Sequence, residues 1–281
     1  MSLRSINIQN ARTGVGLTLP LRSSDSGYFV KGVDGLDPVK AELVYSSFGL
    51  IDGVQFQSAR RESRNIVVSL GFDPDYASTS VSDLRRAVYS VMNPKDEVVF
   101  TIVFADFSGA LSTYNINGYI ETIESPIFSK EPELTISIIC PDPDFLSSTG
   151  TVRSYSTVTS SGTSSPAITY EGTAPTGYAV TMNINRAVTR FDVLHITPDG
   201  LTNTLTTSYS FASGDKLEIS TVPRAKGIWV TRAGVKGTIL QSTTPESAWS
   251  RFTSGVNYFK IVASGTAIPY TLSYQPRISG I

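Results

Sequence analysis

Short runs of apolar and β-branched residues, interrupted by turn residues, recur along most of the 281-residue chain. Segments rich in Val, Ile, Thr, Tyr and Phe alternate with Gly, Pro, Asn and Asp, which is typical of strands joined by turns. The clearest of these segments are residues 28–31, 41–45, 65–72, 97–104, 134–139, 180–184, 217–220, 227–231, 258–262 and 270–274. The pattern predicts a mainly β protein.

One segment, from residue 80 to residue 92, follows a helical period instead. Its apolar residues recur at spacings of three and four, which gives the apolar stripe of an amphipathic helix: Val81, Leu84, Val88 and Val91. Ser80 is a suitable N-cap with Asp83 as the capping-box acid, and Asn93-Pro94 ends the helix. We expect this helix to cover one side of an N-terminal sheet.

The composition changes between residues 147 and 165, where Ser, Thr and Gly dominate and large apolar residues are scarce. Such a stretch is typical of a linker or a poorly packed strand, and it divides the chain into domains 1–150 and 151–281. Turn signals continue after it at the spacing of an antiparallel sandwich. The predicted architecture is an N-terminal β-sandwich with one α-helix, followed by a C-terminal antiparallel β-sandwich.

Charge and hydropathy exclude several classes of partner. The 23 Lys and Arg residues nearly balance the 24 Asp and Glu residues, and no long block of one sign could bind nucleic acid or an anionic membrane. Residues 1–10 lack the features of a signal peptide, and no stretch approaches the roughly 20 apolar residues that span a bilayer. We therefore expect a soluble protein that is not secreted and does not enter membranes.

Most catalytic arrangements are excluded by counting residues. His195 is the single histidine, so a His-Glu-x-x-His zinc site is impossible, and no G-x-S-x-G motif is present. His195 lies in a strand-like run and is interpreted as a structural or surface histidine. The run from Gly172 to Gly177 has the glycine spacing of a phosphate loop, but Tyr178 replaces the required lysine. No catalytic residue and no cofactor is expected.

Two pairs of aspartates could carry other chemistry. Asp73 and Asp75, like Asp142 and Asp144, could be the acid and base of a glycosidase or oxygen ligands for Ca²⁺. Both pairs alternate with proline, however, and Asp is an ordinary turn residue because its side chain binds nearby backbone. A role in turns is the first interpretation, a metal site the second and catalysis the third.

Basic and thiol side chains are interpreted as structural. Arg60, Arg61 and Arg64 lie beside Glu62 and indicate a solvated strand end, or one that pairs in an interface, rather than an anion-binding patch. Cys140 follows an apolar strand and has no neighbouring histidine, so a buried, inert thiol is expected. With a single cysteine, stability must come from burial or assembly.

The two tryptophans, Trp229 and Trp249, both belong to the second half of the chain. Trp229 lies within a predicted strand, where a core position is favoured over a binding role. Trp249 follows a turn-like segment and is expected to be semi-exposed. It is therefore the candidate for contact with a carbohydrate.

Several short motifs stand out in chain order. They are Gly32-Val-Asp-Gly-Leu-Asp-Pro38, Arg64-Asn-Ile66, Asn117-Gly-Tyr-Ile-Glu121, Ile139-Cys-Pro-Asp-Pro-Asp-Phe145, Phe211-Ala-Ser-Gly-Asp215 and Tyr274-Gln-Pro-Arg277. As a set, they resemble the siphophage distal tail protein (Dit) family. The N-terminal motifs span most of residues 30–145, whereas the C-terminal ones are shorter and match the family more loosely.

This resemblance implies a structural protein of the phage baseplate that is not an enzyme. In the family, N-terminal domains form a hexameric ring, and C-terminal sandwiches, often galectin-like, project from its rim. The ring joins the tail tube protein to the tail-tip hub protein, and its outer domains carry receptor-binding proteins or touch the host surface. The chain would then belong to the tail tip of the virion, after assembly in the host cytoplasm.

Two other functions remain open from the sequence. The C-terminal sandwich could be a carbohydrate-binding module that contacts a host surface glycan, which requires a shallow groove with Trp249 or tyrosines exposed. A tail-associated hydrolase would require two carboxylates within roughly 5 to 10 Å across a cleft. Asp142, Asp144, Glu171 and Glu218 are the residues to consider for it.

Overall fold

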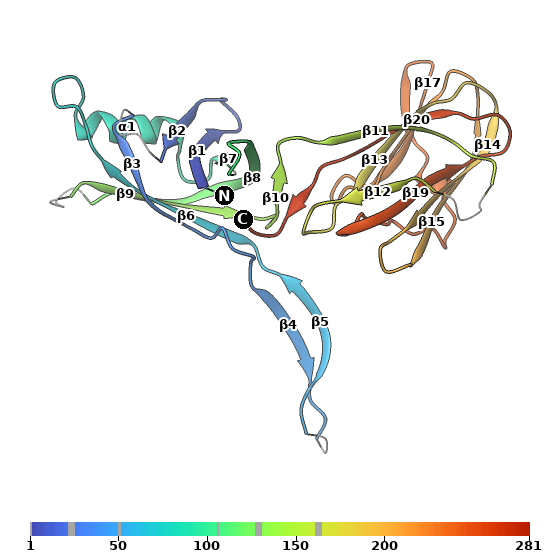
Figure 1. Cartoon of the computed structure of the whole chain (residues 1–281), viewed down its shortest axis with the longest axis horizontal. Helices are drawn as coiled ribbons and strands as arrows, with labels where there is room; N and C mark the ends of the chain where they lie inside the picture. Colours follow the sequence, from blue (N-terminus) through green and yellow to red (C-terminus); the bar gives the residue numbers. More distant parts are fainter. Residues whose placement is uncertain (1, 22–25, 50–51, 106, 127–130, 161–164) are drawn as a thin grey trace. The chain divides into compact units, whose positions relative to one another are not determined.

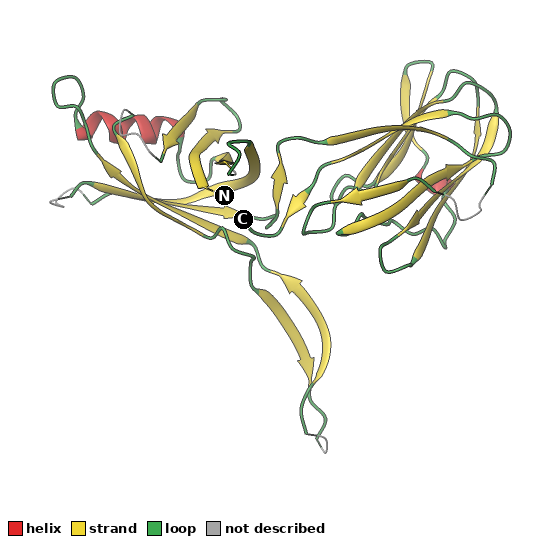
Figure 2. Cartoon of the chain, viewed as in Figure 1, coloured by secondary structure: helices red, strands yellow, loops and turns green. Residues whose placement is uncertain are grey.

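The computed structural model describes residues 2–21, 26–49, 52–105, 107–126, 131–160 and 165–281. The chain forms two compact units, one made of Met1–Ser148 together with Ile278–Ile281 and the other of Thr149–Arg277. Strands dominate both units (Figures 1 and 2), so the prediction of a mainly β fold is confirmed. Within the described ranges, no helix is long and apolar enough to cross a bilayer.

The first unit is built on one large sheet whose strand order is β2-β1-β7-β8-β9-β6-β3, with β10 paired to β8. Alternate residues point into its core: Ile66, Val68 and Leu70 of β6 are fully buried. This period of two is what a sheet with one covered face requires. The strands are β1 (Ser2–Asn10), β2 (Gly16–Pro20), β3 (Tyr28–Asp34), β6 (Arg64–Phe72), β7 (Glu97–Ala105), β8 (Leu111–Glu124), β9 (Glu133–Cys140) and β10 (Phe145–Ser147).

Helix α1 (Val81–Val91) packs its apolar stripe against this core, as the sequence predicted. Leu84, Val88 and Val91 are buried. The capping box forms: the Ser80 hydroxyl accepts a hydrogen bond from the Asp83 amide at 3.2 Å, and the Asp83 carboxylate accepts one from the Ser80 amide at 3.1 Å. The helix therefore begins where its cap dictates.

Two further strands of the first unit, β4 (Ala41–Ser46) and β5 (Gln55–Arg61), pair only with each other in the described structure. We call this hairpin, residues 41–61, the arm. Figure 1 shows that it extends away from the large sheet of its own unit. The arm is unusual because nearly every residue of both strands is exposed.

The second unit is a sandwich of two antiparallel sheets, with strand orders β11-β20-β13-β16-β17-β18 and β12-β19-β14-β15. Its core is filled from both sheets, for example by Val180 of β13 and Val193 of β14. The strands are β11 (Thr151–Ser156), β12 (Ala167–Tyr170), β13 (Tyr178–Asn183), β14 (Val188–Ile196), β15 (Thr202–Phe211), β16 (Lys216–Ser220), β17 (Gly227–Arg232), β18 (Val235–Thr238), β19 (Gly255–Val262) and β20 (Pro269–Tyr274). A 3₁₀ turn, η1 (Leu240–Ser242), follows β18, and β21 (Arg277–Ile278) pairs with β10.

Candidate functional site

The arm carries a continuous apolar face that no described residue of its own unit covers. Leu43, Tyr45 and Phe56 are 47%, 48% and 56% exposed. Because Tyr45 and Phe56 are cross-strand partners, their rings meet edge to face with centroids 6.1 Å apart on this side. Ala59, which pairs with Leu43, continues the same face towards the base of the arm.

The opposite face of the arm is mainly polar and includes one exposed apolar residue, Val44, so the hairpin is amphipathic. Arg60 forms an ion pair with Glu42 at 2.6 Å, and the Gln57 side-chain amide donates a hydrogen bond to the Ser46 hydroxyl at 2.7 Å. Both pairs are exposed and neutral overall. The arm therefore has one face suited to water and one suited to a partner.

The described part of the arm tip adds to this apolar surface. Phe48 is 53% exposed and Val54 is 61% exposed, and both line a shallow hollow of about 340 Å³ with Asp52, Gly53 and Gln55. An isolated two-stranded hairpin is at best marginally stable in water. Its free edges and its apolar face are features that proteins normally cover or pair.

Arg64 closes the base of the arm from within the first unit. Arg64 is 1% exposed, and its guanidinium donates hydrogen bonds to the carbonyl oxygens of four residues: Asp37 at 2.6 Å, Pro143 at 2.7 Å, Ser279 at 2.5 Å, and Gly35. Burial lowers the pKa of Arg64. The prediction of a solvated or interface-pairing strand end is therefore wrong for this residue, which holds three separate segments together.

Two neighbours of Arg64, Phe145 and Gly35, are residue types that suit their positions beside it. Its guanidinium lies 4.5 Å from the ring centroid of Phe145, in a cation–π contact. Gly35 has a φ of +85°, and a Cβ placed on it would lie 1.9 Å from the carbonyl oxygen of Asn65. Only glycine can occupy this position, because a side chain would meet both the strained φ and the backbone of β6.

A second arginine, Arg61, fixes the end of β5. It forms a bidentate ion pair with Asp144, and one of the two N–O distances is 2.8 Å. Asp144 is buried, at 2% exposed. The ion pair raises the pKa of Arg61. Asp142 accepts a hydrogen bond from the Asp144 amide at 3.3 Å, which is the turn role predicted for this pair.

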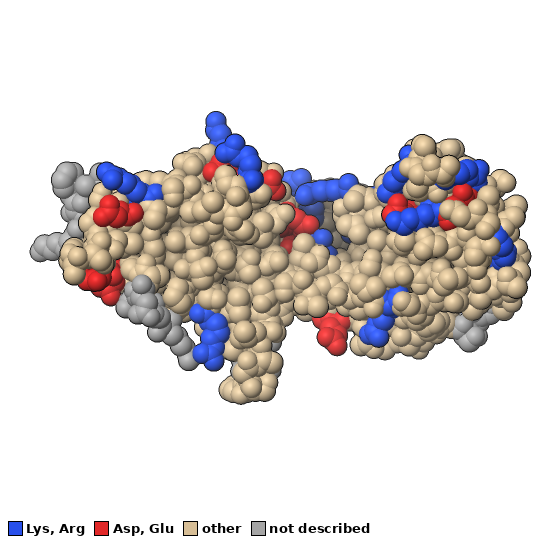
Figure 3. All heavy atoms as spheres, turned by 90° about the horizontal axis from the view of Figure 1, so that it is seen from above, with Lys and Arg blue, Asp and Glu red and all other residues tan. Residues whose placement is uncertain are grey.

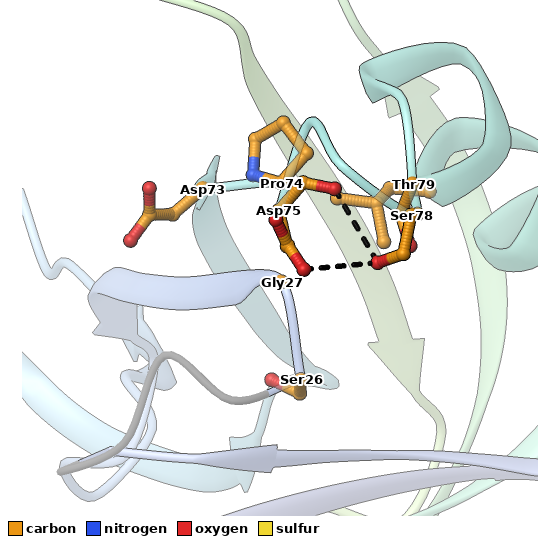
Figure 4. Close-up of a pocket in the computed structure, with 8 residues that line it drawn as sticks. Ser26, Gly27, Asp73, Pro74, Asp75, Ser78 and Thr79 are labelled. Carbon is orange, nitrogen blue, oxygen red and sulfur yellow. Dashed lines mark hydrogen bonds between the residues drawn. The ribbon is translucent and has the colours of Figure 1, made fainter.

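The other aspartate pair borders a polar pocket of about 500 Å³ next to the start of α1 (Figure 4). Asp75 accepts hydrogen bonds from the Ala77 amide and the Ser78 hydroxyl, both at 3.1 Å, and so organises the turn that leads to the helix cap. In Figure 4 the carboxylate of Asp73 points away from that of Asp75. The prediction of turn chemistry is confirmed for Asp75.

Cys140 is a buried residue, as predicted, and His195, interpreted as either structural or on the surface, is buried as well. His195 is fully buried, its Nε2 lies 3.0 Å from the Asn257 side-chain oxygen, and burial lowers its pKa. Cys140 is fully buried in the first unit, where burial raises the pKa of its thiol to about 12. Neither side chain is placed to act as a nucleophile or base on a bound substrate.

One of the two tryptophans, Trp229, occupies a different position from that expected, whereas Trp249 is semi-exposed as expected. Trp249 is half-buried and packs against the core of the second unit, so its role as a carbohydrate contact remains a prediction. Trp229 was predicted to be a core residue, and this is wrong: Ile228 and Val230 on either side of it are buried, so its ring lies on the outer face. There it covers Gly227, with the Lys236 ammonium 5.0 Å from the ring centroid.

The carboxylate of Glu218 is engaged in ion pairs. It lies 3.0 Å from Lys216 and 2.6 Å from Lys236, and both lysines lower its pKa. A glycosidase acid requires a raised pKa. Glu218 is therefore unsuited to that role.

On the face shown in Figure 3, basic and acidic residues are interspersed and neither sign forms a continuous patch.

Three comparisons relate the chain to known proteins. Residues 171–277 match a family model described as the C-terminal domain of the siphovirus-type tail component. The solved structure of the Dit protein of SPP1 is described as a paradigm of the hub adsorption apparatus in phages that infect Gram-positive bacteria. It shares 15% identity with this chain, with a TM-score of 0.64, and the match covers 97% of this chain and 98% of that chain. A baseplate structure of phage P2 shares 9% identity over 99% of both chains, with a TM-score of 0.47. The comparison with curated proteins gave no match.

Proposed function

We propose that this chain, a Dit-type protein by its C-terminal domain and its fold, forms a homo-hexameric ring at the tip of a phage tail. The similarities support a structural role in the tail or baseplate. In the proposed assembly the first unit makes the ring, which joins the tail tube protein to the tail-tip hub protein. The second unit faces outward and supports receptor-binding proteins in the virion, after assembly in the host cytoplasm.

The observation that carries this proposal is the uncovered apolar face of the arm. Leu43, Tyr45 and Phe56 are each about half exposed on a hairpin that has no sheet neighbour in the described structure. A hairpin of this kind gains stability when its apolar face is buried against another surface. A second copy of this chain is the proposed partner.

A ring follows if the arm of each copy binds a different surface on the next copy. Such head-to-tail contacts are heterologous, and they close when the rotation between neighbours divides a full turn. The near balance of 23 basic and 24 acidic residues favours this arrangement, because identical copies then repel each other little. A two-fold dimer would instead pair the same patch with itself.

The test is the mass of the purified chain in solution, measured by multi-angle light scattering over a range of concentrations and followed by negative-stain imaging. A hexamer with a central hole is the expected result. A mass of one chain at every concentration would contradict self-association through the arm. A closed two-fold dimer would contradict the ring.

A further inference from the structure

The arm leaves and re-enters the first unit through two neighbouring segments. Residues 35–40 lead from β3 into β4, and residues 61–64 lead from β5 into β6. We call these two segments the arm root. Because the described strands of the arm pair with no other strand, the direction in which the arm points is determined at the arm root.

A third segment, residues 279–281, lies against the arm root, and we call it the strap. The chain reaches it only after passing through the whole second unit, yet these residues belong to the first unit. The Ile281 amide donates a hydrogen bond to the Leu36 carbonyl oxygen at 3.0 Å, and the Ile281 side chain packs against the core of the first unit. The strap is thus fixed at its far end.

Gly280 brings the strap into direct contact with the arm root. A Cβ added to Gly280 would lie 2.5 Å from Cδ and 2.6 Å from the backbone nitrogen of Pro38, and 2.9 Å from the carbonyl carbon of Asp37. Two of these atoms belong to the backbone of the arm root, so they cannot move aside as the end of a flexible side chain can. Only a residue without a side chain allows this approach.

Arg64 joins the same three parts. It stands at the end of the arm root, donates to the carbonyl oxygens of Gly35 and Asp37 in the other half of the root, and donates to Ser279 of the strap at 2.5 Å. A planar guanidinium can hold several carbonyl oxygens in fixed directions at once, which an ammonium group does less well. Its near-complete burial leaves it no water to bind instead.

We propose that the strap sets the direction of the arm, and that Arg64 and Gly280 are the positioning residues through which it does so. The consequence for assembly rests on the proposed function. A ring closes only when neighbouring copies are related by one particular rotation. A change in the direction of the arm therefore breaks the contact between the arm and the next copy, or forms it at an angle that does not close the ring. The second unit then influences ring formation through its chain connection to the strap.

The direct test measures the direction of the arm by pulsed electron paramagnetic resonance between two spin labels. Ser58→Cys places one label on the arm and Ser90→Cys places the other on α1, and both positions are exposed. We expect Cys140 not to be labelled in the folded chain, because it is fully buried and its pKa is raised to about 12. Labelled chain is diluted with unlabelled chain so that distances within one copy are measured.

Gly280→Ala is the test variant and Gly32→Ala is its matched control, since a Cβ on Gly32 would meet nothing within 4 Å. We expect a single narrow distance distribution in the parent and in Gly32→Ala, and loss of that narrow distribution in Gly280→Ala. Arg64→Lys is expected to behave like Gly280→Ala. An unchanged distribution in Gly280→Ala and Arg64→Lys overturns the proposal.

Circular dichroism and thermal unfolding establish whether each variant folds. If Gly280→Ala does not, Ile281→Ala takes its place, because it loosens the far end of the strap without inserting any atom. The mass of the assembly is measured by light scattering, in a separate experiment from the distance measurement. If the parent forms rings but Gly280→Ala and Arg64→Lys keep a narrow distance distribution, only the proposed role of the strap is overturned. If the parent forms no rings, the proposed function is overturned, and the distance measurement alone decides whether the strap sets the direction of the arm.

Discussion

Replacing Phe56 with serine should break the contact between neighbouring copies without unfolding either unit. Phe56 is 56% exposed and lies outside the core of the first unit. A Phe side chain offers about 200 Å² of surface, so about 110 Å² of it is available to a partner. At about 25 cal/mol per Å², burial of this area contributes about 3 kcal/mol to each contact between copies.

This free energy corresponds to an affinity about a hundredfold weaker at each contact in Phe56→Ser. It is an upper value, since association also costs side-chain ordering and desolvation. Light scattering across a concentration series should show the ring dissociating at a higher concentration in Phe56→Ser than in the parent. The melting temperature of the dissociated chain should not change.

Tyr76→Ser is the matched control for this measurement. Tyr76 is also aromatic and is 79% exposed, but it lies in the loop before α1 rather than on the arm. Loss of an exposed ring at that position should leave the mass curve unchanged. If Phe56→Ser follows the same curve as the parent, the apolar face of the arm is not the contact between copies.

Three other predictions concern stability and reactivity. Ser80→Ala removes the cap of α1 and should lower the free energy of unfolding of the first unit by about 1 kcal/mol, measured by urea denaturation. Cys140 should not react with a thiol reagent at pH 8 until the protein is unfolded, because burial raises its pKa to about 12. Asp215→Asn should cost the second unit about 2 kcal/mol at pH 7, since Asp215 is buried and bonded to Arg232 at 2.6 Å. The pKa of Asp215 is lowered by Arg232, so this stabilisation is complete above about pH 4 and is lost as the pH falls through the folded pKa; thermal melts from pH 7 to pH 2 should show variant and parent converging.

The local elements could be predicted because their signals lie within a few residues. The cap of α1 needs only Ser80 and Asp83, and the helical stripe is visible in the spacing of its apolar residues. The position of Trp229 could also have been found: two buried neighbours at alternate positions force the residue between them onto the outer face of a strand. The alternation of side chains between the two faces of a strand could have been applied to the sequence, but the large apolar ring of Trp229 favoured a core position in the prediction.

The arm itself could not be predicted as an arm. Residues 41–45 have the composition of a strand, and their alternation identifies an apolar face but not what covers it. A strand inside a sheet and a strand of an uncovered hairpin therefore give the same pattern. Arg64 was misread for a related reason, because its partners Gly35 and Ser279 lie 29 and 215 residues away in the chain.

Three of the six motifs that carry the resemblance to distal tail proteins meet at this one arginine. Gly35 and Asp37 belong to the first motif and offer their carbonyl oxygens to Arg64, which begins the second. Pro143 offers another carbonyl oxygen, and Phe145 of the same motif stacks on the guanidinium. None of these residues supplies a reactive group, and each holds the arm root in place. The proposed ring needs such a set, because its assembly would depend on the direction of one exposed hairpin.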